Sequence, residues 1–259
     1  MRAFAIILFS IACAGLGFGA PSTTNDLSEF FGGRDGCFVL YDSQSNSYLR
    51  HNPKGCAERF SPCSTFKIPN TLIVLHTGVA SGPEFSLAWD GVKRSESWDR
   101  DQTLRSAFQG SVVWFYQELA RRVGHKRETE FVRKFAYGNM DTSGGATNFW
   151  LESSLRISAD EQVAFLQRLW ADAIPVSRDA QRITREIMEQ SRRDGRVLYG
   201  KTGTGGDSKA DVAHLGWFVG CVSRGERTFF FATRITGEHD ASGRQARKIA
   251  EAILERLGI

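Results

Sequence analysis

The sequence lacks the charge pattern and the histidine spacing that would indicate nucleic-acid binding or a metal centre. Its formal net charge is only +4, and no long run of lysine and arginine occurs, so electrostatics give no reason to expect a nucleic-acid partner. The five histidines are scattered, without the paired spacing that metal ligands show. We therefore expect neither a metal site nor a nucleic-acid partner.

Apolar runs long enough to cross a membrane are also lacking after the first twenty residues. Those twenty start with Arg2, continue as a largely apolar stretch and end in small residues, which is typical of a secretory signal. Gly17-Phe18-Gly19 fits the small-x-small pattern of a signal-peptidase site better than a cut after Ala20 does. We expect a signal peptide at 1–20, one domain at 21–259 and an exported, periplasmic protein. Lipidation at Cys13 remains an alternative.

Cysteine is scarce, and one of the five cysteines, Cys13, falls inside the predicted signal. Cys37 opens a predicted strand and Cys56 follows the hairpin partner of that strand, so the two could pair in an exported protein. Buried free thiols are an equally good interpretation. The sequence does not decide between them.

The composition is that of an ordinary globular domain, 41% hydrophobic and 24% charged, without internal repeats or low-complexity linkers. Strand patterns occupy both ends of the chain and helical patterns the middle. The expected strands are a hairpin over 37–51 and strands at 196–202, 214–222 and 227–235. The expected helices are 64–78, 112–123, two helices capped by Ser158 and Ser177, and 243–257. This order predicts an α+β fold, in which both chain ends form an antiparallel sheet flanked by helices, with an inserted helical region.

The chemistry centres on Ser64-Thr65-Phe66-Lys67, which precedes an apolar run. Three residues apart on a helix, the serine hydroxyl and the lysine amine share one face. A serine hydroxyl is a poor nucleophile until a base takes its proton, and a desolvated lysine has a lowered pKa and can act as that base. Alone, the pair also fits a capping serine beside a solvated lysine.

In the predicted fold, a cleft between the sheet and the helical region would bring three further motifs together. They are Ser111-Val112-Val113, Tyr137-Gly138-Asn139 and Lys201-Thr202-Gly203-Thr204. On the predicted edge strand, Lys201 presents charge and Gly203 lets a substrate approach the backbone. Each motif also has an ordinary structural explanation as a helix cap, a turn or an exposed edge lysine.

The order and spacing of these motifs, with the second serine 47 residues after Ser64, resemble the class D (oxacillinase-type) serine β-lactamases. The segments 62–70, 149–153 and 216–220 also resemble that family, and the likeness covers essentially the whole mature chain. It implies a fold of the serine β-lactamase and penicillin-binding-protein type.

The resemblance implies five catalytic residues. Ser64 would attack the β-lactam carbonyl and form an acyl-enzyme. Lys67 would add carbon dioxide and act as a carboxylated general base, held by the indole N–H of Trp150. Ser111, assisted by Lys201, would pass a proton to the leaving nitrogen.

The resemblance also implies how the substrate is bound. The backbone N–H groups of Thr204 and the nucleophilic serine would form the oxyanion hole, next to Gly203. Thr202 and an arginine near the start of the last helix would bind the substrate carboxylate, because a guanidinium pairs bidentately with it. Both Arg244 and Arg247 qualify, and we favour Arg244.

The expected partner is a small-molecule β-lactam, with no dissociable cofactor other than the carbon dioxide or bicarbonate that carboxylates Lys67. The sequence leaves a homodimer open. Two other hypotheses use the same serine: a penicillin-binding DD-peptidase, and a non-enzymatic β-lactam sensor domain that signals when it is acylated. Compact length favours the hydrolase over the peptidase, and the lack of preceding membrane helices counts against the sensor.

Overall fold

The computed structural model describes residues 21–207 and 212–259. The expected signal peptide at 1–20, including Cys13, lies outside the described residues.

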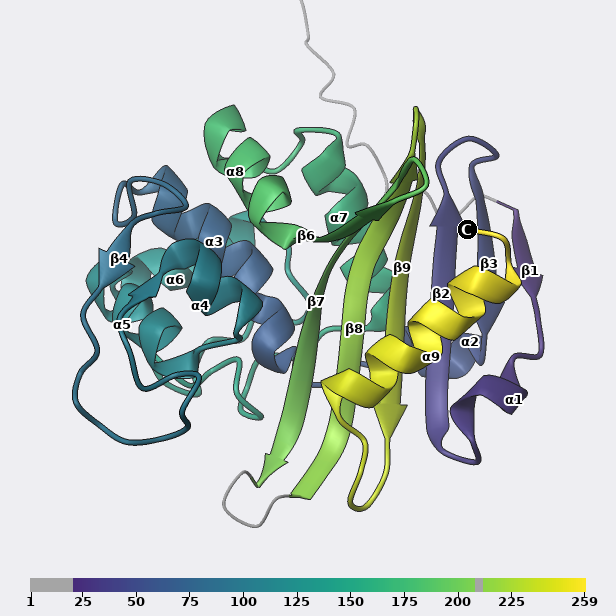
Figure 1. The fold of residues 1–259 in the computed structure, drawn as a ribbon, viewed down its shortest axis with the longest axis horizontal. Helices are drawn as coiled ribbons and strands as arrows, with labels where there is room; N and C mark the ends of the chain where they lie inside the picture. Colours follow the sequence, from purple (N-terminus) through teal and green to yellow (C-terminus); the bar gives the residue numbers. More distant parts are fainter. Residues whose placement is uncertain (1–20, 208–211) are drawn as a thin grey trace, which may run out of the picture.

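A seven-stranded sheet forms the centre of the described fold, in the order β1-β3-β2-β9-β8-β7-β6 (Figure 1). Its strands are β1 (Ser22–Thr24), β2 (Asp35–Asp42), β3 (Ser47–His51), β6 (Glu189–Arg193), β7 (Arg196–Asp207), β8 (Val212–Arg224) and β9 (Arg227–Thr236). All neighbours are antiparallel except β1 and β3. Since β2 pairs with β9, the two chain ends close one sheet, and the predicted α+β fold is confirmed.

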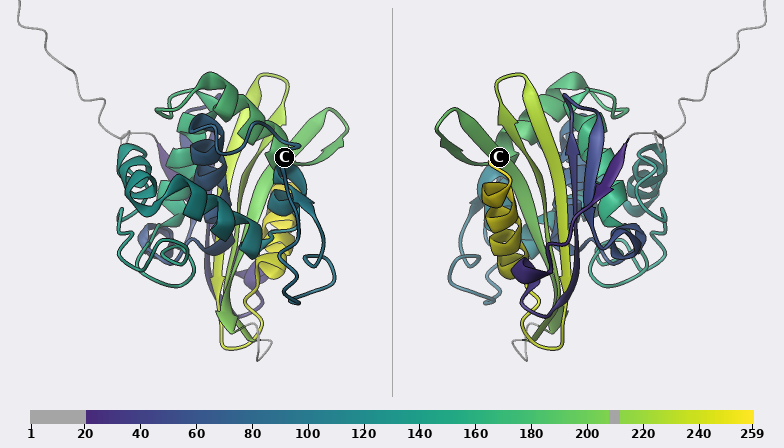
Figure 2. Two further views of the ribbon diagram at one scale, coloured as in Figure 1. Left: turned by 90° about the vertical axis from the view of Figure 1, so that its left-hand side faces the viewer. Right: turned by 90° about the vertical axis from the view of Figure 1, so that its right-hand side faces the viewer.

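Both faces of the central strands are buried, because helices cover the sheet on either side (Figure 2). On one face α9 (Gly243–Arg256) and the short α1 (Ser28–Phe31) cover an apolar cluster that includes Phe38 and Phe231. On the other face lie α2 (Pro53–Ala57) and α7 (Ala159–Trp170). A strand buried on both faces has a continuous apolar sequence instead of an alternating one, and the run from Cys37 to Leu40 in β2 is an example.

The helical region inserted between β3 and β6 lies to one side of the sheet, at the left of Figure 1. Besides α7 it contains α3 (Lys67–His76), α4 (Leu104–Gln109), α5 (Val113–Val123), α6 (His125–Lys134), α8 (Arg178–Met188) and the small pair β4 (Ser86–Leu87) and β5 (Gln102–Thr103). The expected caps are present. Ser158 and Glu161 form a capping box at α7, and the Ser177 side chain caps α8.

The structure differs from the sequence prediction in several details. The first predicted helix, expected from Ser64, opens as a 3₁₀ turn, η1 (Cys63–Phe66), and α3 begins only at Lys67. Strand β7 extends to Asp207 instead of Thr202. The edge strands β1 and β6 were not predicted, because their short polar sequences have no apolar alternation to mark one buried face.

All four cysteines of the described chain are buried free thiols: Cys37, Cys56, Cys63 and Cys221. The structure therefore has the free-thiol arrangement rather than a Cys37–Cys56 disulfide. The Cys56 thiol is accommodated by backbone carbonyl oxygens, 3.4 Å from that of Phe38 and 3.3 Å from that of His51.

Candidate active site

Ser64 and Lys67 lie side by side where η1 passes into α3. The Lys67 Nζ is 3.0 Å from the Ser64 Oγ, and the lysine side chain is almost entirely buried. Burial, with a smaller contribution from the positive charge of Lys201, holds the pKa of Lys67 well below its usual value. A lowered pKa favours the neutral amine, the form that can accept the serine proton.

Aromatic side chains pack around Phe66, the residue directly before Lys67. Phe66 stacks on Trp150 with ring centroids 5.4 Å apart, and Phe149 meets both rings edge-on. The Tyr116 ring centroid lies 5.2 Å from the Lys67 Nζ. An aromatic ring thus borders the buried amine on one side.

Trp150 is tied to the nucleophile turn through Ser61. The Ser61 Oγ donates to the backbone oxygen of Trp150 at 3.0 Å and accepts from the N–H of Glu152 at 2.8 Å. The Trp217 indole donates to the Ser61 backbone oxygen at 2.9 Å. One buried serine thus links the loop of Trp150, strand β8 and the turn that carries the nucleophile.

Ser111 and Lys201 form a second serine–lysine pair, between the α4–α5 turn and β7. The Lys201 Nζ donates to the Ser111 Oγ at 3.0 Å and to the Thr202 backbone oxygen at 2.9 Å. Burial lowers the pKa of Lys201 to about 7. Near neutral pH this amine can therefore either hold or release a proton.

Backbone strain marks both serines. Cys63, directly before the nucleophile, has φ 48°, and Ser111 itself has φ 56°. Left-handed backbone at a residue with a side chain costs on the order of 1–3 kcal/mol and persists only where surrounding contacts enforce it. At the first turn, the Pro62 oxygen supplies such contacts by accepting from the N–H (3.1 Å) and the hydroxyl (2.7 Å) of Thr65.

Strand β7 passes close to the nucleophile turn at Gly203. A Cβ on Gly203 would lie 2.9 Å from the Pro62 oxygen, closer than real Cβ contacts, and 3.1 Å from the Thr65 Cγ2, which is tighter than most of them. Next to it, Thr204 is fixed by its hydroxyl, which accepts from the Gly243 N–H at 2.9 Å. The glycine therefore lets the Thr204 backbone come up beside the turn that carries Ser64.

The two candidate arginines on α9 are in different environments. Arg247 is occupied: its guanidinium pairs with Glu251 at 2.8 Å, donates to Gln190 at 2.9 Å and lies over the Phe218 ring. Phe218 belongs to the apolar cluster on the α9 face of the sheet. Arg244 is exposed and directly follows Gly243, which contacts the backbone of β7. The surroundings thus favour Arg244.

The Tyr-Gly-Asn motif supports the fold around the site. Gly138 has φ 56°, and a Cβ there would lie 1.9 Å from the Arg156 oxygen, so only glycine fits this turn. Tyr137 packs edge-on against Phe66, with centroids 5.7 Å apart. Asn139 accepts from the Arg156 N–H at 2.9 Å. This is the turn chemistry expected from the sequence.

Glu152 forms a bridge that the sequence analysis missed. Its carboxylate accepts from the Gly206 N–H at 2.6 Å and contacts His214 Nε2, so the loop after Trp150 is connected to β7 and β8. Glu152 itself has φ 53°. Nothing in the sequence pairs it with His214, although it lies in a segment that matches the class D pattern.

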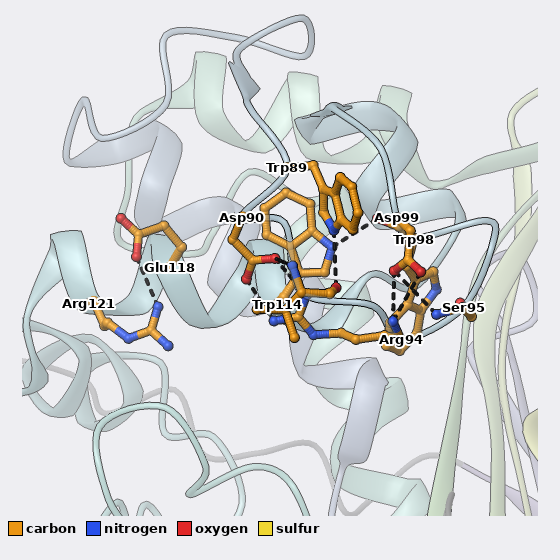
Figure 3. Close-up of polar contacts among 10 residues, drawn as sticks. Trp89, Asp90, Arg94, Ser95, Trp98, Asp99, Trp114, Glu118 and Arg121 are labelled. Carbon is orange, nitrogen blue, oxygen red and sulfur yellow. Dashed lines mark hydrogen bonds and ion pairs between the residues drawn. The ribbon is translucent and has the colours of Figure 1, made fainter.

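A second missed feature is the loop of residues 89–99 (Figure 3). Arg94 pairs with Asp90, and its backbone N–H donates to Asp99, so the loop has its own polar framework. The Trp98 indole donates to the Gly110 oxygen at 3.0 Å, and the Trp114 indole donates to the Trp98 oxygen at 3.1 Å. The loop is thereby anchored beside the turn that carries Ser111.

Among the described residues, no group of three or more histidine, cysteine, aspartate or glutamate side chains could hold a metal ion. No helix in the described part of the chain is long and apolar enough to cross a membrane.

The buried Lys201 predicts a pH-dependent stability. Its pKa falls from 10.5 when exposed to about 7 in the fold, so the unfolded chain binds more protons between these values and stability falls as pH decreases from 10 to 7. Lys201→Met should reduce the difference in unfolding free energy between pH 10 and pH 7 by roughly 3 kcal/mol. Urea unfolding at both pH values measures it. An exposed control, Lys248→Met, should leave the difference unchanged, and equal effects of both variants would contradict the assignment.

Comparisons with known proteins agree with this geometry. A family model described as "Penicillin binding protein transpeptidase domain" matches residues 36–255, so the chain is of the penicillin-binding-protein type. Among curated proteins it is similar to the "Probable beta-lactamase YbxI" of Bacillus subtilis (strain 168), with 39% identity over 90% of this chain and 85% of that protein. Among solved structures it is similar to "Class D beta-lactamase BAT-2", at 38% identity and a TM-score of 0.84, over 90% of this chain and 96% of the other.

A further similar structure is the C-terminal domain of the Bacillus licheniformis BlaR penicillin-receptor, at 34% identity and a TM-score of 0.88, over 93% of this chain and 98% of that domain. The match to the full-length regulatory protein BlaR1 covers 39% of that protein, at 35% identity. The identity to the two β-lactamases, 39% and 38%, is higher than the identity to the BlaR proteins, and the chain covers 85% and 96% of their lengths. The chain therefore belongs to the class D β-lactamase family.

Proposed function

We propose that the protein hydrolyses the β-lactam ring of penicillin-type antibiotics through an acyl-enzyme on Ser64, an activity that confers resistance. The observation that carries this proposal is the 3.0 Å contact between the Ser64 hydroxyl and the buried Lys67 amine, whose pKa burial holds well below its usual value. Membership of the class D β-lactamase family supports it.

In the first half-reaction, the base at Lys67, a carbamate where carbon dioxide has added to the neutral amine, would take the proton from Ser64 while the serine oxygen adds to the β-lactam carbonyl carbon. The backbone N–H groups of Ser64 and Thr204 stabilise the oxyanion, and the close approach at Gly203 supports that placement. The ring C–N bond then breaks. Ser111, hydrogen-bonded to Lys201, passes a proton to the leaving nitrogen.

In the second half-reaction, water attacks the ester and needs a base on the same side as Lys67. The burial and lowered pKa of Lys67 fit carboxylation, and bound carbon dioxide would supply a carbamate base, which the class D resemblance assigns to the Trp150 indole to hold. Thr202 and Arg244 would hold the substrate carboxylate at the β7 edge, since a guanidinium pairs with it through two hydrogen bonds.

Carboxylation of Lys67 predicts that turnover depends on bicarbonate. Carbon dioxide adds only to the neutral amine, so removing it should lower the rate of penicillin hydrolysis and added bicarbonate should restore it, by about tenfold or more for loss of a general base. Hydrolysis in degassed and in bicarbonate-containing buffer at constant pH and ionic strength measures this. Chloride at equal ionic strength is the control, and equal rates in all buffers would contradict the carbamate.

A penicillin receptor is the second candidate, because the BlaR C-terminal domain has a TM-score of 0.88 to this chain. A receptor would be acylated on Ser64 and stay acylated, whereas a hydrolase turns over. A penicillin-binding DD-peptidase would also be trapped by the antibiotic. Repeated turnover of a penicillin by the purified protein separates the hydrolase from both.

We also propose that the protein is exported to the periplasm, with residues 1–20 removed and 21–259 as the catalytic domain. This rests on the signal-like composition of the first twenty residues. N-terminal sequencing of the secreted protein tests it, and an intact Met1 in the mature protein would contradict it.

A further inference from the structure

Three arginines of strands β7, β8 and β9 stand next to one another across the end of the sheet, beside Arg193 of β6, which is also a direct partner of Arg196. Arg196 of β7 is the direct partner of Arg224 on β8, and Arg224 is the direct partner of Arg227 on β9. Direct cross-strand partners point to the same face, and like charges there destabilise a sheet. We call these three residues the arginine row.

The arginine row is poorly neutralised within the chain. Arg227 pairs with the carboxylate of Asp42 at 2.6 Å, and this guanidinium holds the pKa of Asp42 well below its usual range. Among the described residues, Arg196 and Arg224 have no ion pair with a carboxylate. Two adjacent guanidinium groups therefore remain available to an outside anion.

The arginine row borders a cavity with a partly apolar lining. The cavity has a volume of about 340 Å³, at the small end of the roughly 300–1,000 Å³ typical of ligand pockets. Its apolar lining includes Leu40, Val222 and Phe229 from the sheet and Leu257 and Ile259 after α9. The carboxylate of Asp42 also lines the cavity, where Arg227 neutralises it. A ligand that fills it needs an anionic group at one end and an apolar chain at the other.

The dipole of α9 indicates how a ligand would be oriented in the cavity. The C-terminal end of α9, next to Leu257, carries partial negative charge and disfavours an anion on that side. The anionic group should therefore lie against Arg196 and Arg224, with the chain directed toward Leu257.

The cavity is on the opposite face of the sheet from the candidate active site. Arg196 lines the cavity, whereas Lys201, an odd number of residues further along β7, contacts Ser111 on the helical side. We propose that this cavity is a second binding site, for an amphipathic anion with a carboxylate or phosphate head group on an alkyl chain. The proposal is independent of the hydrolase function.

Isothermal titration of the purified protein with decanoate, below its micellar concentration, tests the site. We expect saturable one-to-one binding, weakened about tenfold or more in Arg196→Gln/Arg224→Gln because charge-assisted hydrogen bonds are lost. The control Arg121→Gln/Arg122→Gln removes the same charge from exposed α5 and should bind as the unmutated protein does. Acetate, which lacks the chain, should give no saturable binding at the same concentration.

Absence of saturable decanoate binding, or equal weakening in both double variants, would overturn the proposal. If the double variant fails to fold, the exposed Arg224→Gln alone replaces it. Flotation with phosphatidylcholine vesicles containing about one quarter phosphatidylglycerol distinguishes the source of the ligand. Flotation that depends on Arg224 identifies a membrane head group, and decanoate binding without flotation identifies a free amphiphile.

Discussion

Lys67→Ala is expected to lower penicillin turnover by about 10³-fold or more and to leave the protein acylated on Ser64. The variant loses the only base within hydrogen-bond distance of the nucleophile in the described structure. Both half-reactions need a base. Because opening of the strained ring favours acylation, the variant should lose more rate in hydrolysis of the ester than in acylation. Steady-state rates and the intact mass of the protein after mixing with a penicillin measure the two effects.

The control is Lys134→Ala, which removes an exposed lysine from the end of α6. It should retain the turnover of the unmutated protein. If Lys67→Ala is folded and turns over at the normal rate, the buried amine is not the base and the proposed mechanism is wrong.

Gly203→Ala is expected to reduce kcat/KM by about 10²-fold, the effect of losing one oxyanion donor. The added Cβ would lie 2.9 Å from the Pro62 backbone oxygen, and a backbone atom cannot rotate away as a flexible side chain can. Strand β7 must then move away from the Ser64 turn and take the Thr204 N–H with it. Hydrolysis rates measure the loss, and the thermal midpoint shows whether the fold is intact.

Gly82→Ala is the matched control, because a Cβ at Gly82 meets nothing within 4 Å. It should leave both kcat/KM and the thermal midpoint nearly unchanged. Normal kcat/KM in a folded Gly203→Ala would mean that the oxyanion is not stabilised from β7.

The sequence was sufficient for the local part of the site. Ser64 and Lys67 are three residues apart, so helical geometry alone predicts their contact, and the structure places the two atoms 3.0 Å apart. Apolar runs and alternating apolar patterns likewise predicted the hairpin and the strands at the chain end, hence a sheet closed by both ends.

The long-range contacts had no comparable signal. Ser111 and Lys201 are 90 positions apart, and only their match to the class D pattern suggested that they meet. The Glu152–His214 bridge depends on a loop whose left-handed residues follow from tertiary contacts rather than from composition. The arginine row could not be predicted, because its members belong to three strands and the sequence of one strand does not determine its register with the next.

The most direct test of the central claim is the time course of the Ser64 adduct after the unmutated protein is mixed with excess penicillin. Rapid quenching, intact-mass measurement and peptide mapping follow the adduct while absorbance follows the β-lactam ring. A hydrolase predicts an adduct on Ser64 that forms, persists only while substrate lasts and then disappears, with many rings opened per protein molecule. A stable adduct with one ring opened per molecule would contradict hydrolysis and identify a penicillin-binding receptor or peptidase.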